Sequence, residues 1–437
     1  MRRRALLLLL LASGGCSILT DSFEIDTFSG DPFPIDVDTT TGAILVGLRD
    51  GTVDRTAVLD IMSPVTIEDS GAGSTPLVDN PQLDLLGEDP AGALAVPRAH
   101  FDGPQVIHMH PCNDEACTVG DDASTRGYSA LVGGNSLAGD DLRLALGSNS
   151  VFILPNVAGD TAHRSEICDA VYPSPFRGGG TMIIEGTELP FSSFRPTLQT
   201  CLAPDPDPAK LQSQRGTDAL FVASTSLGVT LLATSAYERY RAEQLLATGI
   251  SPPDVAALPA DSVTLPGGAV GGHATTIPSF ALVAASNGAS QPRSPCRQVY
   301  ASHLLEPADC DDNPTTDCPC SPPGEQPRFC PVPAVTELAP PTGLAVLVVD
   351  DDEPVLQALR TELSPDQPDI DGILGTQAML APTIDADYPH NRILMRCAPH
   401  TPGCVVRPEF DDEDFRPQFQ GCVGDRSSGS GSGGPIE

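Results

Sequence analysis

Short apolar runs separated by turn-forming residues fill most of the chain after residue 35, and this pattern predicts β-strands rather than helices. In the first half, the runs occupy residues 42–48, 56–61, 64–68, 105–109, 142–146 and 151–154. A second series includes residues 181–184, 219–232 and 343–349. The chain is therefore expected to be mainly β, and its 437 residues are enough for two domains or one large two-lobed domain.

Composition shifts divide the chain further. The segment 163–180, with Cys168 and three consecutive glycines at its end, separates the two series of strands. We therefore expect an N-terminal β lobe at 35–162 and a C-terminal β lobe at 163–410. Residues 294–333 hold five cysteines among many Pro and Asp residues, which predicts a disulfide-rich insertion in the second lobe. The Ser/Gly-rich residues 423–437 are expected to form a flexible tail.

The N-terminus has the pattern of an export signal. Three arginines precede an apolar run at 5–12, and Ser13-Gly14-Gly15-Cys16 follows. This arrangement resembles the bacterial lipobox, which implies a signal peptide at 1–15, lipid on Cys16 and a tether at 16–34. Ser17 favours the outer membrane by the enterobacterial sorting rule. The alternative is an ordinary secreted protein cut near Gly15.

The formal net charge is −34, and so acidic a surface repels phosphate backbones. The sequence therefore argues against binding of nucleic acid. With 44 Pro, 41 Gly and no Trp, the composition suits a β-rich protein with long loops. After Cys16, twelve of the 13 cysteines remain. In an oxidising compartment these are expected to form disulfides, whose pairing the sequence leaves open.

Two halves of the chain share a pattern of motifs. Near the end, the sequence reads IDGILG at 370–375, AML at 378–380 and IDADYPHNRIL at 384–394. This series resembles the C-terminal segment of pepsin-like and retropepsin-like aspartic proteases, in which an apolar-apolar-Gly strand precedes a short helix and a hairpin strand. An earlier copy of the apolar-Gly element is ALVGGNSL at 130–137. The resemblance implies a two-lobed β-barrel architecture.

The resemblance also locates two loops that carry the catalytic aspartates in that family. The first is AVLDIMSPVTI at 57–67, which places Asp60 at the aspartate position. The second is ALFVASTSL at 219–227, and alignment of its apolar residues puts Val222 at the aspartate position. Asp60 is therefore the candidate catalytic residue, with Val222 in place of its partner.

Aspartic-protease catalysis needs two carboxylates that share one proton, and this reading leaves only one. Ile61 and Met62 also replace the threonine and glycine expected after the first aspartate. Asp218 precedes the apolar residues of the second loop and is not expected to substitute. The sequence thus predicts a pseudoenzyme with a vestigial Asp60, which binds an extended peptide or another envelope ligand. The alternative is an active aspartic endopeptidase that pairs Asp60 with an unidentified second carboxylate.

Other motifs favour structural interpretations. His108 and His110, followed by Cys112 and Cys117, suggest a metal site, but a small disulfide loop between the cysteines, with the two histidines on opposite faces of a strand end, is the favoured interpretation. The acidic run after residue 349 resembles a receiver-domain strand, although a buried strand leading into an acidic turn and a helix at 355–363 is the simpler hypothesis. We therefore expect no metal and no cofactor.

Overall fold

The computed structural model describes residues 33–38, 40–70, 77–88, 94–101, 105–108, 128–155, 170–184, 187–204, 216–265, 268–284, 294–302, 333–363, 369–397 and 401–408. The expected signal peptide, Cys16, the tail and most of the cysteine-rich insertion lie outside these residues, as do His110, Cys112 and Cys117.

The first lobe is a nine-stranded sheet. It contains β2 (Asp36–Val37), β3 (Ile44–Asp50), β4 (Val53–Leu59), β5 (Thr66–Glu68), β6 (Leu77–Asp79), β7 (Leu83–Glu88), β8 (Leu94–Phe101), β9 (Val106–His108) and β10 (Ala130–Val132). In β3, Ile44, Val46 and Leu48 alternate inward, as the period of two requires. A two-residue turn joins β3 to β4 where Gly51 has φ +53°.

The second lobe is an eleven-stranded sheet. It contains β14 (Phe176–Arg177), β17 (Arg195–Leu202), β18 (Thr217–Ala223), β19 (Thr230–Ala233), β20 (Ala260–Leu265), β21 (Gly268–Ile277), β22 (Phe280–Val283), β23 (Pro333–Leu338), β24 (Leu344–Val349), β25 (Gly372–Leu374) and β28 (Cys404–Pro408). A separate two-stranded ribbon, β15 (Gly180–Ile184) with β16 (Thr187–Phe191), is inserted between β14 and β17.

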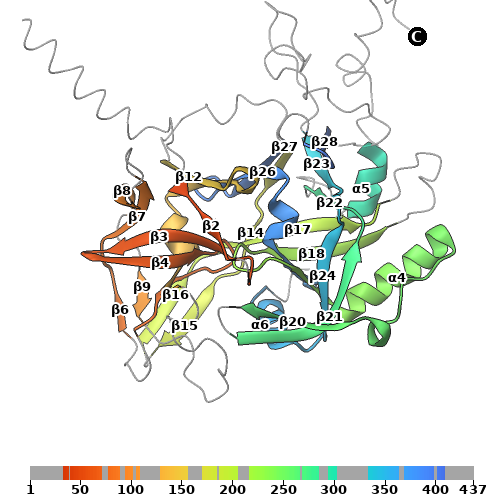
Figure 1. Ribbon diagram of the computed structural model, residues 1–437, viewed down its shortest axis with the longest axis horizontal. Coiled ribbons are helices and arrows are strands. Elements are labelled where there is room, and N and C mark those ends of the chain that lie inside the picture. Colours follow the sequence, from red (N-terminus) through yellow and green to blue (C-terminus); the bar gives the residue numbers. More distant parts are fainter. Residues whose placement is uncertain are drawn as a thin grey trace, which may run out of the picture.

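A third sheet of six strands joins the lobes. Its order is β1 (Phe33–Pro34), β12 (Ser150–Pro155), β11 (Asp140–Ala145), β26 (Pro382–Asp387), β27 (Arg392–Cys397) and β13 (Ala170–Pro173). Because β11 pairs with β26, the two halves of the chain meet inside one sheet. Phe33 and Pro34, expected at the end of the tether, pair with β12 instead and extend this sheet. Figure 1 shows first-lobe strands at the left, second-lobe strands at the right, and β12, β26 and β27 along the top.

Helices cover the second lobe and close the short connections. They are α3 (Gly134–Leu137), α4 (Thr234–Thr248), α5 (Pro295–Ser302) and α6 (Pro354–Leu363), with 3-10 turns at η1 (Leu146–Ser148), η4 (Val255–Ala257) and η5 (Thr376–Met379). α6 begins at a proline and buries Leu356, Leu359 and Leu363 on one face. The expected strand, acidic turn and helix are confirmed there. Among the described residues, no helix is both long and apolar enough to span a membrane.

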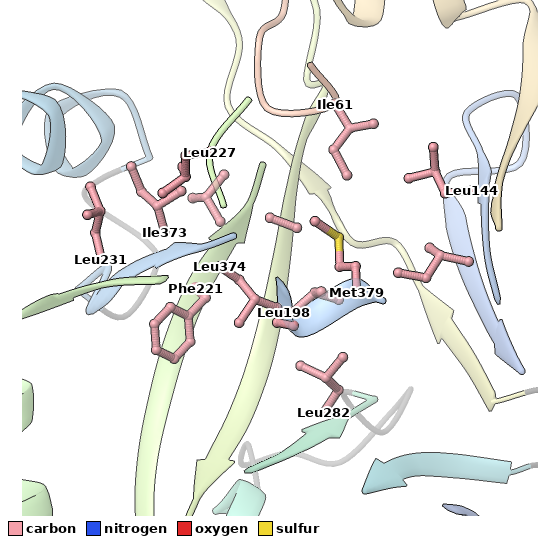
Figure 2. Packing of buried hydrophobic residues seen from close by; sticks show 14 of the residues in the cluster. Ile61, Leu144, Leu198, Phe221, Leu227, Leu231, Leu282, Ile373, Leu374 and Met379 are labelled. Atoms are coloured by element: carbon pink, nitrogen blue, oxygen red, sulfur yellow. The ribbon is translucent and has the colours of Figure 1, made fainter. Parts of the chain in front are cut away.

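One hydrophobic core runs through both lobes. It includes Ile61 and Leu144 from the first half of the chain and Leu198, Leu227 and Met379 from the second. Figure 2 shows Met379 between side chains from both halves. Since apolar burial supplies most of the favourable free energy of folding, the lobes are stabilised jointly rather than as independent units.

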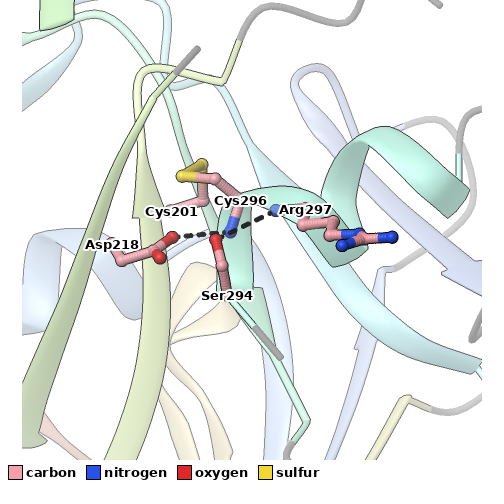
Figure 3. Close-up of a disulfide and its surroundings, with 5 residues drawn as sticks. All are labelled: Cys201, Asp218, Ser294, Cys296 and Arg297. Carbon is pink, nitrogen blue, oxygen red and sulfur yellow. Dashed lines mark hydrogen bonds between the residues drawn. A yellow bond between two sulfur atoms is a disulfide. The ribbon is translucent and has the colours of Figure 1, made fainter. Parts of the chain in front are cut away.

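Disulfides are present at the second lobe, as expected. Cys201 of β17 is bonded to Cys296 of α5, and Cys397 of β27 is bonded to Cys404 of β28. Beside the first bond, the backbone amide of Cys296 donates to Asp218 at 2.8 Å (Figure 3). The start of the cysteine-rich segment is thus fixed to the sheet. The remaining cysteines lie outside the described residues.

Candidate functional site

Two loops occupy equivalent places in the two lobes. β4 ends at Leu59, which is the register partner of Val132 in the parallel strand β10. β18 ends at Ala223, the partner of Leu374 in the parallel strand β25. The next amide along each chain continues the ladder: Asp60 donates to Val132 at 3.0 Å, and Ser224 donates to Leu374 at 2.9 Å. Asp60 and Ser224 are therefore the equivalent residues of the two lobes.

The glycine that ends each apolar-apolar-Gly motif has a packing reason. A Cβ on Gly133 would lie 2.2 Å from the carbonyl oxygen of Val65, and one on Gly375 would lie 2.3 Å from that of Val229. Both distances are far below van der Waals contact, so only glycine lets the backbones approach this closely. The motif read from the sequence thus marks the same close crossing in both lobes.

The side chains of the two equivalent residues, Asp60 and Ser224, form a hydrogen bond with each other. Ser224 donates its hydroxyl to Oδ1 of Asp60 at 3.0 Å, and its Oγ is 2.9 Å from Oγ of Ser226. Each of these side-chain oxygens also accepts a backbone amide from its own loop. The amide of Met62 donates to Oδ1 of Asp60 at 3.0 Å, and the amide of Ser226 donates to Oγ of Ser224 at 3.1 Å. All of these polar side chains are buried, with Asp60 only 2% exposed and Ser224 0% exposed.

The assignment of Val222 to the second aspartate position is corrected by this geometry. Val222 lies inside β18, between Thr197 of β17 and Ile373 of β25, and its side chain is buried. The residue that faces Asp60 is Ser224, two positions further on. The alignment of apolar residues was two positions out because the apolar run of the second lobe, residues 219–223, is two residues longer than the run at 57–59 in the first lobe. Thr225 could have fixed the alignment, since it is the threonine that the resemblance expects directly after the aspartate position.

Thr225 braces the two loops. Its hydroxyl donates to the carbonyl oxygen of Leu59 at 2.5 Å and accepts from the amide of Ile61 at 3.1 Å. Its own amide lies 3.3 Å from Oδ1 of Asp60. Ile61 occupies the matching place in the first lobe and has no hydroxyl to return the contact. The hydroxyl that links the two loops therefore comes from the second lobe and has no counterpart at Ile61 in the first.

Burial raises the pKa of Asp60, and the hydrogen bonds from Met62, Ser224, Ser226 and Thr225 act in the opposite direction. Within the described part of the chain, the hydrogen-bond partners of this carboxylate are backbone amides and serine hydroxyls, and none is a second carboxylate. Asp60 therefore has no acidic partner with which to share a proton among these residues.

Tyr388 directly follows β26, near enough to Asp60 for the charge of that carboxylate to act on its hydroxyl. Burial, with the charge of Asp60 as a smaller cause, raises its pKa, and its hydroxyl has no hydrogen-bond partner within the described residues. The ring stacks on Phe176 with centroids 4.5 Å apart and meets Phe194 edge-on at 5.8 Å. Aromatic packing therefore fills the space between β14, β17 and the joining sheet.

The other sequence candidates lie elsewhere. Asp218 is at the opposite end of β18 from Ser224 and accepts the amide of Cys296. His108 contacts Asp79 at 2.7 Å and Glu68 at 3.4 Å. Across the ranges that the structure describes, no cluster of three or more His, Cys, Asp or Glu side chains is placed to hold a metal ion.

No protein-family model matches the chain, and no curated protein matches it in sequence. Two solved structures are similar in fold. Basic 7S globulin from soybean is 12% identical, with 83% of this chain and 94% of that chain covered, at a TM-score of 0.38. An aspartic proteinase from Irpex lacteus is 10% identical, with 85% and 98% covered, at a TM-score of 0.36.

The expected fold class is confirmed. The chain is mainly β, with two lobes, a joining sheet and disulfides at the second lobe. The repeated loop next to an apolar-apolar-Gly strand, once in each lobe, is the feature by which the sequence pointed to this fold.

Proposed function

We propose that this protein is a catalytically silent relative of aspartic proteases in architecture, exported as a lipoprotein and acting in the cell envelope by binding or as a structural component. The observation that carries the proposal is the hydrogen bond between Ser224 and Asp60. This bond supports the proposal because the resemblance to aspartic proteases would require a second carboxylate beside Asp60, and Ser224 supplies a hydroxyl there.

The chemistry follows from this pairing. In an aspartic dyad, one carboxylate takes a proton from water while the other, protonated, donates to the substrate carbonyl. Serine is not acidic enough to share a proton with Asp60, so only one of the two roles can be filled. The buried Asp60 is also kept toward its neutral form by its raised pKa. A neutral acid bonded to a hydroxyl supports a loop junction and does not activate water.

A cleavage assay on matched variants tests this directly. Wild-type protein, Asp60→Asn and Ser224→Asp would be incubated with a mixed peptide library between about pH 3 and pH 7, the range in which carboxylate dyads titrate. Wild type and Asp60→Asn are expected to give the same background by mass spectrometry. Cleavage by wild type that Asp60→Asn abolishes would establish the alternative, an active endopeptidase with a second carboxylate elsewhere. Cleavage by Ser224→Asp would show that the second carboxylate is the only part that the wild-type protein lacks for peptidase activity.

The export proposal rests on the sequence from Met1 to Cys16. A lipid on Cys16 would hold the protein at a membrane surface, with one diacylglyceryl group and an acyl chain supplying the affinity. Expression in a bacterial host with a radiolabelled fatty acid is the test. Label should enter wild type and be absent from Cys16→Ser, which should leave the membrane fraction. Equal labelling of both proteins would refute the anchor.

Binding of an extended peptide is the proposed mode of interaction. Its support is the resemblance to aspartic proteases, which implies a cleft between two lobes that takes an extended chain. Nucleic acid is not proposed as a partner, because the net charge of −34 opposes it.

A further inference from the structure

The second half of helix α4 projects from the second lobe. The buried residues of α4 all lie in its first half, and Tyr240 is the last of them. The helix continues to Thr248 and ends at Gly249, which adopts a left-handed conformation and donates its amide to the carbonyl oxygen of Leu245. Figure 1 shows α4 extending outward past the strands at the right-hand edge of the molecule. The projection is therefore a regular, capped helix end.

Large apolar side chains gather at this helix end. Leu245 is 48% exposed, Leu246 74% and Ile250 73%. They are three of the eight large hydrophobic residues exposed in the described part of the chain, and they fall within six consecutive positions. A contact between Leu245 and Ile250 is common at a helix end of this type, but it gives no reason for Leu246. Apolar groups gathered on a surface in this way mark a contact site for another apolar surface.

The segment that follows the helix is fixed back onto it. Arg241 donates from Nε to the carbonyl oxygen of Pro252 at 3.0 Å. The same guanidinium forms ion pairs with Glu238 on one side and Asp254 on the other. These contacts hold Ile250 at the end of the helix. A fixed frame presents the apolar side chains, so little conformational entropy is lost when they are buried against a partner.

The charge at the helix end differs from that of the chain as a whole. Residues 239–251 hold two arginines and one glutamate, a formal charge of +1, whereas the whole chain carries −34. A second copy of so acidic a protein would be repelled from the first. A bilayer instead offers an apolar interior, and its anionic headgroups attract positive charge. The charge distribution therefore favours a lipid surface over self-association.

We propose that Leu245, Leu246 and Ile250 form a membrane-contact tip, which enters the interface of the bilayer that holds the lipid anchor. This inference rests on the proposed lipid on Cys16, because the anchor would keep the folded body beside that bilayer. Residues 17–32 separate Cys16 from β1, and a chain of this length reaches at most about 60 Å. The lipid would supply most of the affinity, and the tip would set which face of the protein lies against the membrane.

Tryptophan fluorescence tests the tip, because the chain has no Trp and each variant therefore reports from one position. Leu246→Trp is compared with Ile183→Trp, a 68% exposed site on β15 of the separate ribbon. The full mature proteins, carrying the lipid, are reconstituted into phosphatidylcholine vesicles with plain or brominated acyl chains, since bromine quenches tryptophan on contact. Emission of Leu246→Trp should be at least about twofold weaker in brominated vesicles, as expected for a side chain buried about 5–10 Å into the interface. Emission of Ile183→Trp should be the same in both.

The outcomes separate the tip from the anchor. Equal emission of Leu246→Trp in both kinds of vesicle, in protein that carries the lipid, would overturn the tip and leave the anchor intact. Equal quenching of both variants would also overturn it, because contact would not be confined to α4. Absence of fatty-acid label from wild type would refute the anchor and, with it, the tip.

Sedimentation of the unlipidated Cys16→Ser protein tests the other occupant, a second copy of the chain. A monomer is expected, because the net charge opposes self-association. A dimer that the added substitution Leu246→Ser abolishes would assign the apolar cluster to a second copy and would contradict the membrane contact.

Discussion

Ser224 donates a hydrogen bond of 3.0 Å to Asp60 across the junction of the two lobes. The residues are 164 positions apart in the chain, yet each follows the last residue of an equivalent strand. A hydroxyl and a single carboxyl group can both be satisfied when buried, whereas two ionised carboxylates at this distance cannot. The substitution therefore removes a source of repulsion as well as a catalytic group.

Ser224→Asp should restore that repulsion. At pH 7 we expect its free energy of unfolding to fall by about 2–4 kcal/mol, and to recover toward pH 4 as one proton becomes shared by the pair. Urea unfolding of the variant at both pH values measures this, with Ser224→Asn as the uncharged control of similar size. Equal destabilisation of both variants at both pH values would mean that volume, not charge, sets the cost.

Asp60→Asn should be at least as stable as wild type at neutral pH. Burial raises the pKa of Asp60, so the folded state holds its proton more tightly than the unfolded state. Stability from this group is complete below the ordinary aspartate pKa and is lost as pH rises toward the raised value. Asparagine keeps an oxygen for Met62 and Ser224 without a charge. A gain of about 1–3 kcal/mol at pH 7 that disappears near pH 4 is expected from urea titrations.

Thr225→Val should weaken the junction of the lobes. Valine keeps the shape but leaves the carbonyl of Leu59 and the amide of Ile61 without their hydroxyl partner. Two buried groups left unpaired predict a loss of about 2–4 kcal/mol in thermal or urea unfolding. Thr197→Val is the control, because its hydroxyl bonds one half-buried carbonyl, that of Pro175. A loss no larger than in the control would show that the brace is dispensable.

A pair of acidic residues in the joining sheet should make the protein sensitive to alkali. Asp141 of β11 faces Asp387 of β26, and Arg392 and His390 bond Asp387. Burial, with the hydrogen bond and charge of Asp387, raises the pKa of Asp141 to about 8, while the pKa of Asp387 is lowered. The shared proton therefore resides on Asp141.

Because the folded pKa of Asp141 lies above its unfolded value, its contribution to stability is complete at low pH and declines as pH rises to about 8. Asp141→Asn should abolish this decline and exceed wild type by roughly 2–4 kcal/mol at pH 9. Urea titrations at pH 4 and pH 9 measure the difference. Asp385→Asn, in the neighbouring pair with Arg143, should instead destabilise at both pH values. Parallel pH profiles of wild type and Asp141→Asn would contradict the proton-sharing account.

The two described disulfides should contribute differently to the free energy of unfolding. Cys201–Cys296 closes a loop of sequence separation 95, and Cys397–Cys404 one of separation 7. Restriction of the unfolded chain predicts losses of about 4–5 kcal/mol for the first and about 2–2.5 kcal/mol for the second. Paired Cys→Ala variants in urea unfolding test the order. A larger loss for the short loop would show that native-state contacts dominate.

The sequence by itself determined the mainly β class, the two series of strands and the apolar-apolar-Gly motifs. Strand periodicity and glycine positions can be recognised in short stretches of sequence, without knowledge of distant contacts. It also pointed to Asp60, since an acidic residue at the end of an apolar run is conspicuous. Tertiary structure alone decided which residue faces it. The choice between Val222 and Ser224 depends on where β18 stops pairing with β25, a parallel contact between segments about 150 residues apart. The Asp141–Asp387 pair likewise arises from long-range packing, because β11 and β26 are far apart in the chain and nothing local in the sequence shows that they pair.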